Sequence, residues 1–129
     1  MKVILSIKPE FAGKIFDGSK KFEFRRTIFK DPSISNVVVY ASAPISMVIG
    51  EFEIEKIIHS EIPNLWSETK EMSGISEDYY LDYFEGKASG YAIKIKKAKV
   101  YKKQRCIKTE YGMRAPQSFA YLRQGEQSK

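Results

Sequence analysis

The first apolar positions of the chain follow the spacing of a strand and then of a helix. Residues 2–7 form a short apolar run, and Pro9 follows it, which predicts a strand leading into a helix with proline in its first turn. Apolar residues then recur at helical spacing from Phe11 to Phe16, and Gly18 suits the position just after a helix. We therefore expect a strand and a helix before residue 18.

The next segments have the period of strands. FEFR at 22–25 alternates two phenylalanines with Glu23 and Arg25, which predicts a half-buried strand with one charged face. A β-branched run at 36–42 predicts a second strand. In 48–55 apolar residues alternate with glutamates, which predicts a third strand with one acidic face.

The second half of the chain predicts helices around one long strand. Helices are predicted at 62–72, at 76–86 and, as a short final element, at 116–122. Between them, the apolar positions of 91–101 change from odd to even numbers at Lys96 and Lys97. A β-bulge at that point would keep both halves in one strand and bend it. This order of elements predicts an α+β fold, a small mixed β-barrel with flanking helices.

Composition predicts one domain over residues 1–129, with the last few residues frayed, because there is no repeat, linker or break in composition. No apolar run approaches the roughly 20 residues that span a bilayer, and charge and proline come too early for a signal peptide. We therefore expect a cytoplasmic protein without membrane contact. With Cys106 and His59 as the single residues of their types, the sequence predicts no internal disulfide, multi-cysteine zinc site, histidine pair for a metal or Ser-His-Asp relay. We expect no metal and no cofactor.

Charge is segregated along the chain, although the total is only +6. Residues 1–50 carry +4, residues 51–85 carry −8 and residues 86–129 carry +10. Eight basic and no acidic side chains lie between Gly90 and Thr109, which is typical of a surface that meets phosphates. The alternative is that the acidic middle neutralises the basic end after folding.

One short motif joins the predicted helix to the predicted strand. Gly18, Lys20, Glu23 and Arg25 form a GxKxxExR pattern after the helix. With the later segments VIGEFEI and GYAIKI, this pattern resembles the ASCH family, whose fold is a β-barrel related to PUA domains. The resemblance covers most of residues 3–100 and implies a PUA-like barrel.

The resemblance also implies a function associated with RNA. Proteins of this family bind nucleic acid, some are ribonucleases, and some relatives remove the acyl group from acetylcytidine. The site in such proteins is a cleft near the helix and the strand that follows it. It would here be lined by Lys20, Glu23 and Arg25, which would also be the catalytic residues of an enzyme, with Lys8 as a neighbour.

The residue types of the motif suit a nucleotide ligand on physical grounds as well. Lys20 offers a point charge for a phosphate and Arg25 a bidentate fork, while Glu23 can orient Arg25 or accept a hydrogen bond from a base. The alternative is a ladder of charges on a solvated strand face, which contributes little to stability. The predicted nucleic-acid contacts are Lys8, Lys20, Arg25, Arg26, Lys94, Lys96, Lys97 and Lys99.

One departure from the family argues against deacylation. The acetylcytidine-cleaving relatives have a threonine nucleophile three residues after the lysine, where this chain has Glu23. Thr27 is nearby but at the wrong spacing, and a carboxylate does not readily form the same acyl-enzyme. Ser19 and Ser42 are interpreted as turn and strand-end residues.

Further polar and aromatic clusters leave alternatives open. Alternate glutamates from Glu51 to Glu55 can share a hard cation, but cross-strand pairing with Lys94, Lys96 or Lys99 is the simpler arrangement. The aromatic residues of 79–84 fit core packing better than base stacking. The better stacking candidates are Tyr91, Tyr101 and Tyr111.

The sequence thus favours an RNA- or nucleotide-binding domain with a basic cleft. Whether the protein is an enzyme stays open, because a metal-independent ribonuclease, or a hydrolase acting on a modified nucleoside, fits the same residues. A third hypothesis is an adaptor that meets a protein partner through its acidic residues 51–85, with an exposed Trp66 or Tyr80 as the anchor.

Overall fold

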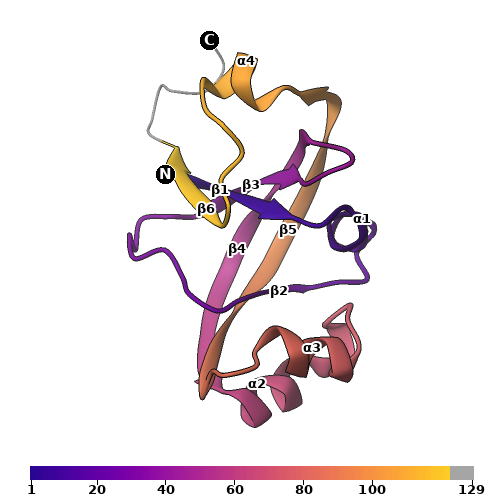
Figure 1. The fold of residues 1–129 in the computed structure, drawn as a ribbon, viewed down its shortest axis with the longest axis vertical. Helices are drawn as coiled ribbons and strands as arrows, with labels where there is room; N and C mark the ends of the chain where they lie inside the picture. Colours follow the sequence, from indigo (N-terminus) through magenta and orange to yellow (C-terminus); the bar gives the residue numbers. More distant parts are fainter. Residues whose placement is uncertain (123–129) are drawn as a thin grey trace.

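The computed structural model describes residues 1–122 as a curved six-stranded sheet with helices at its edges (Figure 1). The predicted frayed end lies outside the described residues. The strands are β1 (Lys2–Ile7), β2 (Phe22–Arg25), β3 (Asn36–Ala41), β4 (Met47–Glu61), β5 (Ser89–Arg105) and β6 (Phe119–Leu122). The helices are α1 (Pro9–Asp17), α2 (Ile62–Thr69), the 3₁₀ turn η1 (Lys70–Met72), α3 (Glu77–Tyr83) and α4 (Ile107–Tyr111).

The sheet is mixed, with the order β2-β5-β4-β3-β1-β6. β1 runs parallel to β3, and the other pairs are antiparallel. The long strands β4 and β5 form a ribbon that extends to the lower end of the molecule, where α2 and α3 lie (Figure 1). The α+β class, with a barrel-like sheet and flanking helices, is therefore confirmed.

Within residues 1–122 the pairing leaves the sheet open between its edge strands β2 and β6. Side chains cross this seam. Arg25 of β2 donates through Nη2 to Oγ of Ser118 at 2.6 Å. Ser118 is the residue directly before β6. The backbone amide of Lys30 donates to the Tyr121 hydroxyl at 2.9 Å, and the rings of Phe29 and Phe119 meet edge to face. The seam between β2 and β6 is thus bridged by side chains instead of a backbone ladder.

Three apolar clusters hold the elements in place. One fills the interior of the curved sheet beneath α1, and its buried side chains include Ile15, Phe52 and Ile93. A second lies beneath α4. The third joins β2 to α2 and α3 through Phe24 and Tyr80. β2 therefore has one face against the interior of the barrel and the other against the helical lobe.

The bend of β5 lies where the sequence predicts it. The register pairs Glu53 with Lys97 and Ile54 with Ile95, so Lys96 is the extra residue of a bulge. The apolar residues before and after the bulge can therefore belong to one continuous strand.

The predicted C-terminal helix at 116–122 is wrong, since Phe119–Leu122 is strand β6. It pairs antiparallel with β1, with Leu5 opposite Phe119 and Lys2 opposite Leu122. The free edge of β1 offers backbone hydrogen bonds to a four-residue segment that is too short for a stable isolated helix. A short helix forms earlier instead, at α4.

No helix in the described part of the chain is long and apolar enough to cross a membrane.

Candidate functional site

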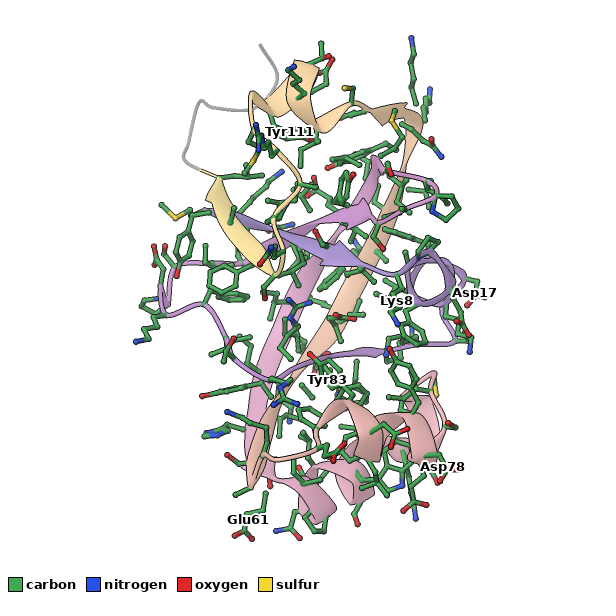
Figure 2. All side chains as sticks on the ribbon, viewed as in Figure 1. Lys8, Asp17, Glu61, Asp78, Tyr83 and Tyr111 are labelled. Atoms are coloured by element: carbon green, nitrogen blue, oxygen red, sulfur yellow. The ribbon has the colours of Figure 1, made fainter. Side chains whose placement is uncertain are left out.

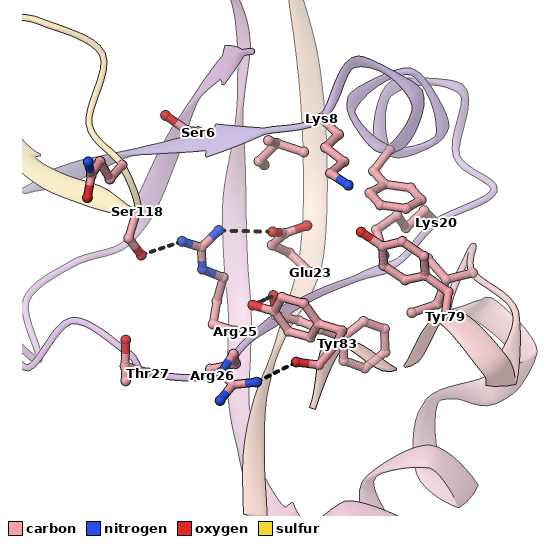
Figure 3. A pocket seen from close by; sticks show the side chains of 15 residues that line it. Ser6, Lys8, Lys20, Glu23, Arg25, Arg26, Thr27, Tyr79, Tyr83 and Ser118 are labelled. Atoms are coloured by element: carbon pink, nitrogen blue, oxygen red, sulfur yellow. Dashed lines mark hydrogen bonds and ion pairs between the residues drawn. The ribbon is translucent and has the colours of Figure 1, made fainter. Parts of the chain in front are cut away.

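A pocket of about 460 Å³ opens at the seam, between β1 and β2 and beside α1 and α3 (Figure 3). Its size lies within the range of roughly 300–1,000 Å³ that is usual for ligand sites. The lining residues are Ser6, Ile7, Lys8, Phe11, Lys20, Glu23, Phe24, Arg25, Arg26, Thr27, Ile75, Tyr79, Tyr83, Gln117 and Ser118. The three motif residues that the sequence places in one cleft therefore meet in one pocket.

Lys20 is almost completely buried, with 2% of its surface exposed. Its ammonium donates to the backbone carbonyl of Ser73 at 2.8 Å and lies 5.4 and 4.9 Å from the ring centroids of Phe11 and Phe24. Burial lowers the pKa of Lys20 to about 8, against the opposing effect of the Glu23 charge. The ammonium has three donors, so capacity remains for a ligand.

The loop between η1 and α3 holds Lys20 from behind. Gly74 has φ +72°, and a Cβ on it would lie only 2.6 to 3.0 Å from the Cβ, Cγ and Cδ of Lys20. Lys14 of α1 donates to the Gly74 carbonyl at 3.0 Å, which ties the loop to the helix. A glycine is required here because the backbone is left-handed and passes directly over the lysine stem.

Glu23 and Arg25 lie on β2 and point together toward the pocket (Figure 3). Arg25 Nη1 lies 3.3 Å from Glu23 Oε2, and Nη2 donates to Ser118. Glu23 and Arg25 are 7% and 9% exposed, so the predicted half-buried strand is in fact buried on both faces. The charged face is buried as well because it borders a narrow hollow instead of bulk solvent.

Aromatic rings form the opposite wall of the pocket. The half-buried Tyr79 and Tyr83 come from α3, and Tyr79 meets Phe11 edge to face with centroids 5.0 Å apart. The Tyr83 hydroxyl donates to the Phe24 carbonyl at 3.1 Å, and burial raises its pKa. The pocket therefore combines flat apolar surfaces with charges, which is the combination that a nucleotide base and its phosphate require.

Two more cationic side chains, Lys8 and Arg26, lie at the rim of the pocket. Lys8, at the N-cap of α1, is exposed and lies 5.5 Å from the Tyr79 ring centroid. Arg26 donates through Nη1 to the carbonyls of Tyr83 and Glu85, at 2.8 and 3.0 Å. Its charge is thus directed to the C-terminal end of α3, where a cation is stabilised by the helix dipole. Among the described residues that line the pocket, four are basic and one is acidic, which favours an anionic ligand.

The predicted lysines of β5 lie elsewhere and do not line this pocket. Lys94 forms an ion pair with Glu55 at 3.2 Å, and Lys97 lies opposite Glu53 in the sheet. Lys96, at the bulge, and Lys99, beyond it, are exposed. A role of these four lysines in nucleic-acid binding stays a prediction.

The acidic face of β4 is partly as predicted. The pair of Glu55 with Lys94 is one of the expected cross-strand contacts. Glu51 instead accepts from Lys2 at 3.1 Å, from Asn36 at 3.2 Å and from the Tyr101 hydroxyl at 2.7 Å. Among residues 1–122, no three His, Cys, Asp or Glu side chains gather as a metal site would require.

Most of the aromatic residues that were candidates for a protein anchor or for base stacking are buried. Tyr80 is fully buried, so it is not the exposed anchor that the adaptor hypothesis requires, and the half-buried Trp66 packs against it. Tyr101 and Tyr111 are each 8% exposed in the cluster under α4, which contradicts a stacking role for them. Tyr91 is half-buried and stacks on the exposed His59, with centroids 4.3 Å apart.

Sequence reasoning missed the residues that complete the pocket from the C-terminal side. Ser118 lies 93 positions after Arg25. The backbone amide of Ser6 in β1 donates to the Ser118 carbonyl, and the Ser6 hydroxyl donates to the Pro116 carbonyl. No periodicity links these serines to the motif, because their position depends on the pairing of β6 with β1. Only the tertiary structure brings them to the seam.

Comparison with known proteins places the chain in a family. The ASCH domain family matches residues 5–111, and the chain belongs to it. An ASCH domain-containing ribonuclease from Zymomonas mobilis is 30% identical over 131 residues, which cover 99% of this chain and 88% of that protein.

Solved structures of ASCH from Zymomonas mobilis have the same fold. The crystal structure of ASCH from that organism is 32% identical, has a TM-score of 0.89, and covers 97% of this chain and 90% of its own. A serine-to-alanine mutant of the protein also gives a TM-score of 0.89, at 30% identity with the same coverage.

Proposed function

We propose that the protein is an RNA-binding ASCH domain whose seam pocket holds one nucleotide of a single-stranded RNA. The observation that carries the proposal is the burial of Lys20 and Arg25 at a hollow with aromatic walls. Burying cations is costly unless they have partners, and the described contacts leave donors on the Lys20 ammonium for a ligand.

Each side of the pocket has a distinct part in this proposal. Arg25, with its planar fork, faces a phosphate, and Lys20 adds charge deeper in the pocket. Glu23 accepts a hydrogen bond from an exocyclic amino group of the base. Tyr79 and Tyr83 provide a surface on which the base lies, and such stacking contributes about 1–3 kcal/mol per base.

A binding experiment tests this proposal. Anisotropy of a fluorescent single-stranded RNA of about six nucleotides is measured at about 50 and 200 mM salt. We expect binding that weakens as salt rises, since phosphate contacts release counterions. Lys20→Ala and Arg25→Ala should each weaken binding at least tenfold. The matched control Lys56→Ala removes one exposed lysine on β4, remote from the pocket lining, and should bind as the wild type does.

Two results would contradict the proposal. One is the absence of RNA binding at low salt. The other is an affinity that neither salt nor the two pocket substitutions change.

A second candidate function is cleavage of the bound RNA, which the similarity to the Zymomonas mobilis ribonuclease favours. In this scheme the ribose 2′-oxygen attacks the adjacent phosphorus and the P–O5′ bond breaks. The leaving 5′ oxygen takes a proton from water, so that a 2′,3′-cyclic phosphate and a 5′-hydroxyl form. Glu23 or neutral Lys20 accepts the 2′ proton, since a pKa of about 8 leaves some Lys20 neutral near pH 7.5. Arg25 stabilises the charge that develops on the phosphoryl oxygens.

Product analysis separates binding from cleavage. Purified protein is incubated with a labelled RNA in EDTA, and the same sequence with a single 2′-deoxynucleotide at the cleavage position is the matched substrate. Cleavage of the first and not of the second, lost in both Lys20→Ala and Glu23→Ala, would support the enzyme. Binding without products would leave an RNA-binding domain.

A further inference from the structure

A second basic surface lies at the far end of β5 from the seam pocket. It is an open hollow of about 680 Å³, formed by the end of β5, the start of α4 and Met47. Four basic residues and one acidic residue, Glu110, are among those that line it. The basic residues are Lys99, Lys102, Lys103 and Arg105. In Figures 1 and 2 this end of the molecule is opposite the end that carries α2 and α3.

The charge balance distinguishes this end from the middle of β5. Lys94 has Glu55 as an ion-pair partner, and Lys97 and Lys99 have Glu53 and Glu51 opposite them in the sheet. Beyond Lys99 the glutamates of β4 end. Lys102 and Lys103 are exposed, and their charges are not offset by a facing acidic strand in the described register.

Arg105 is already positioned at this surface. Its guanidinium carbon lies 3.8 Å from the Tyr101 ring centroid, and Nη1 donates to the Tyr111 hydroxyl at 2.9 Å. Both tyrosines are buried, so the side chains that hold the guanidinium are themselves fixed in position. An arginine that is held this way loses less conformational entropy when it binds a phosphate.

We infer that the surface of Lys102, Lys103 and Arg105 binds the phosphate backbone of the same RNA chain at a distance from the pocket. The inference rests on the proposed function. From Tyr91 to Arg105, β5 spans at most roughly 46 Å at about 3.3 Å per residue. An RNA of one or two nucleotides in the pocket cannot reach this surface, whereas one of about 25 nucleotides can.

The test compares RNA length and the position of the removed charge. The Lys102→Gln/Lys103→Gln variant removes two charges from the surface. The matched control, Lys56→Gln/Lys87→Gln, removes two exposed charges from β4 and from the segment after α3. Each protein is titrated with a two-nucleotide and a 25-nucleotide single-stranded RNA, and circular dichroism verifies folding.

We expect the surface variant to bind the long RNA roughly tenfold more weakly, with a salt slope smaller by about 1.4, because each phosphate contact contributes about 0.7. Its affinity for the two-nucleotide RNA, and both affinities of the control, should stay within about twofold of the wild type. An unchanged affinity of the surface variant for long RNA would overturn the inference.

A third variant, Lys96→Gln/Lys97→Gln, locates the effect along β5. If this variant loses less affinity for the long RNA than the surface variant does, the far end of β5 is supported as the phosphate site. If the two variants lose the same affinity, the phosphate site is not at the far end. Failure of the proposed pocket would be recognised separately, because the two-nucleotide RNA would then bind to neither the wild type nor the variants.

Discussion

Two carboxylates of this protein lie among cations, and their surroundings differ in one decisive respect. Glu51 accepts hydrogen bonds from Lys2, Asn36 and the Tyr101 hydroxyl. Glu23 borders a hollow and, among residues 1–122, has a single hydrogen-bond contact, from Arg25 at 3.3 Å. The first cluster is saturated and stabilises the sheet, whereas the second keeps hydrogen-bonding capacity for a ligand. A buried charge identifies a site only when some of its partners are missing.

The largest effect is expected where the saturated cluster is broken. Glu51→Ala leaves Lys2, Asn36 and Tyr101 without their acceptor and should lower the free energy of unfolding by about 3 kcal/mol. RNA affinity should stay within twofold, since Glu51 does not line the seam pocket. Thermal unfolding and anisotropy measure the two quantities.

Low pH should remove the stabilisation that the Glu51 cluster contributes. Burial raises the pKa of Glu51, but hydrogen bonds from Tyr101 and Lys2 outweigh burial and hold the pKa below its usual 4.5. A depressed pKa means that this stabilisation is present above pH 4.5 and lost as pH falls further. The gap in melting temperature between wild type and Glu51→Ala should therefore narrow at pH 3. A gap that is equal at pH 7 and pH 3 would contradict this account.

The next effect concerns the loop that holds Lys20. In Gly74→Ala the new Cβ meets the stem of Lys20 within 3.0 Å at φ +72°, so we expect a destabilisation of about 2 kcal/mol and weaker RNA binding. The matched control is Gly86→Ala, which has φ +84° and no atom within 4 Å of its Cβ. It should lose about 1 kcal/mol and bind RNA normally. Equal RNA affinities of the two variants would show that the loop does not position Lys20.

A smaller effect is expected from replacing the fork of Arg25 by a point charge. Arg25→Lys keeps the charge but cannot contact Glu23 and Ser118 together, so RNA affinity should fall about tenfold, or about 1.4 kcal/mol. Arg26→Lys, on the adjacent rim residue, is the matched control and should cost less than threefold. Anisotropy titrations at one salt concentration decide between them. If the two variants lose RNA affinity equally, the pocket recognises the charge at position 25 and not the planar geometry of the arginine.

The smallest effect has the opposite sign. Lys20→Met removes a buried cation and should raise the free energy of unfolding at pH 7 by about 1 kcal/mol, although the Ser73 carbonyl loses its donor. The pKa of Lys20 is about 8 in the folded protein and near 10.5 in the unfolded chain. The unfolded state therefore binds more protons between these values, and wild-type stability rises with pH there.

Melting temperatures at pH 7 and 9.5 test this sign, and anisotropy tests the loss of RNA binding that we expect with it. The advantage of Lys20→Met should shrink at the higher pH. A variant that is less stable than the wild type at pH 7 would show that Lys20 is structural.

Prediction from the sequence succeeded where the signal is local. The period of FEFR places Glu23 and Arg25 on one face of a strand, and the helix stop at Gly18 puts Lys20 just before that strand. The structure brings the three side chains together at one pocket. It failed at 116–122, where a free strand edge outweighs the helical spacing. It also predicted β2 to be a half-buried strand, whereas both faces are buried, because the wall that covers the charged face comes from Ser118 and α3.

The sequence by itself determined the order of elements as far as β5, the bulge near Lys96 and the charged motif, since these depend on residues close together along the chain. Only the tertiary structure decided which charges are saturated. The glutamates of β4 and the motif glutamate of β2 look alike in sequence, but their partners come from strands and loops tens of residues away. Hydrogen-bond saturation is a property of three-dimensional neighbours, and only the folded chain defines those neighbours.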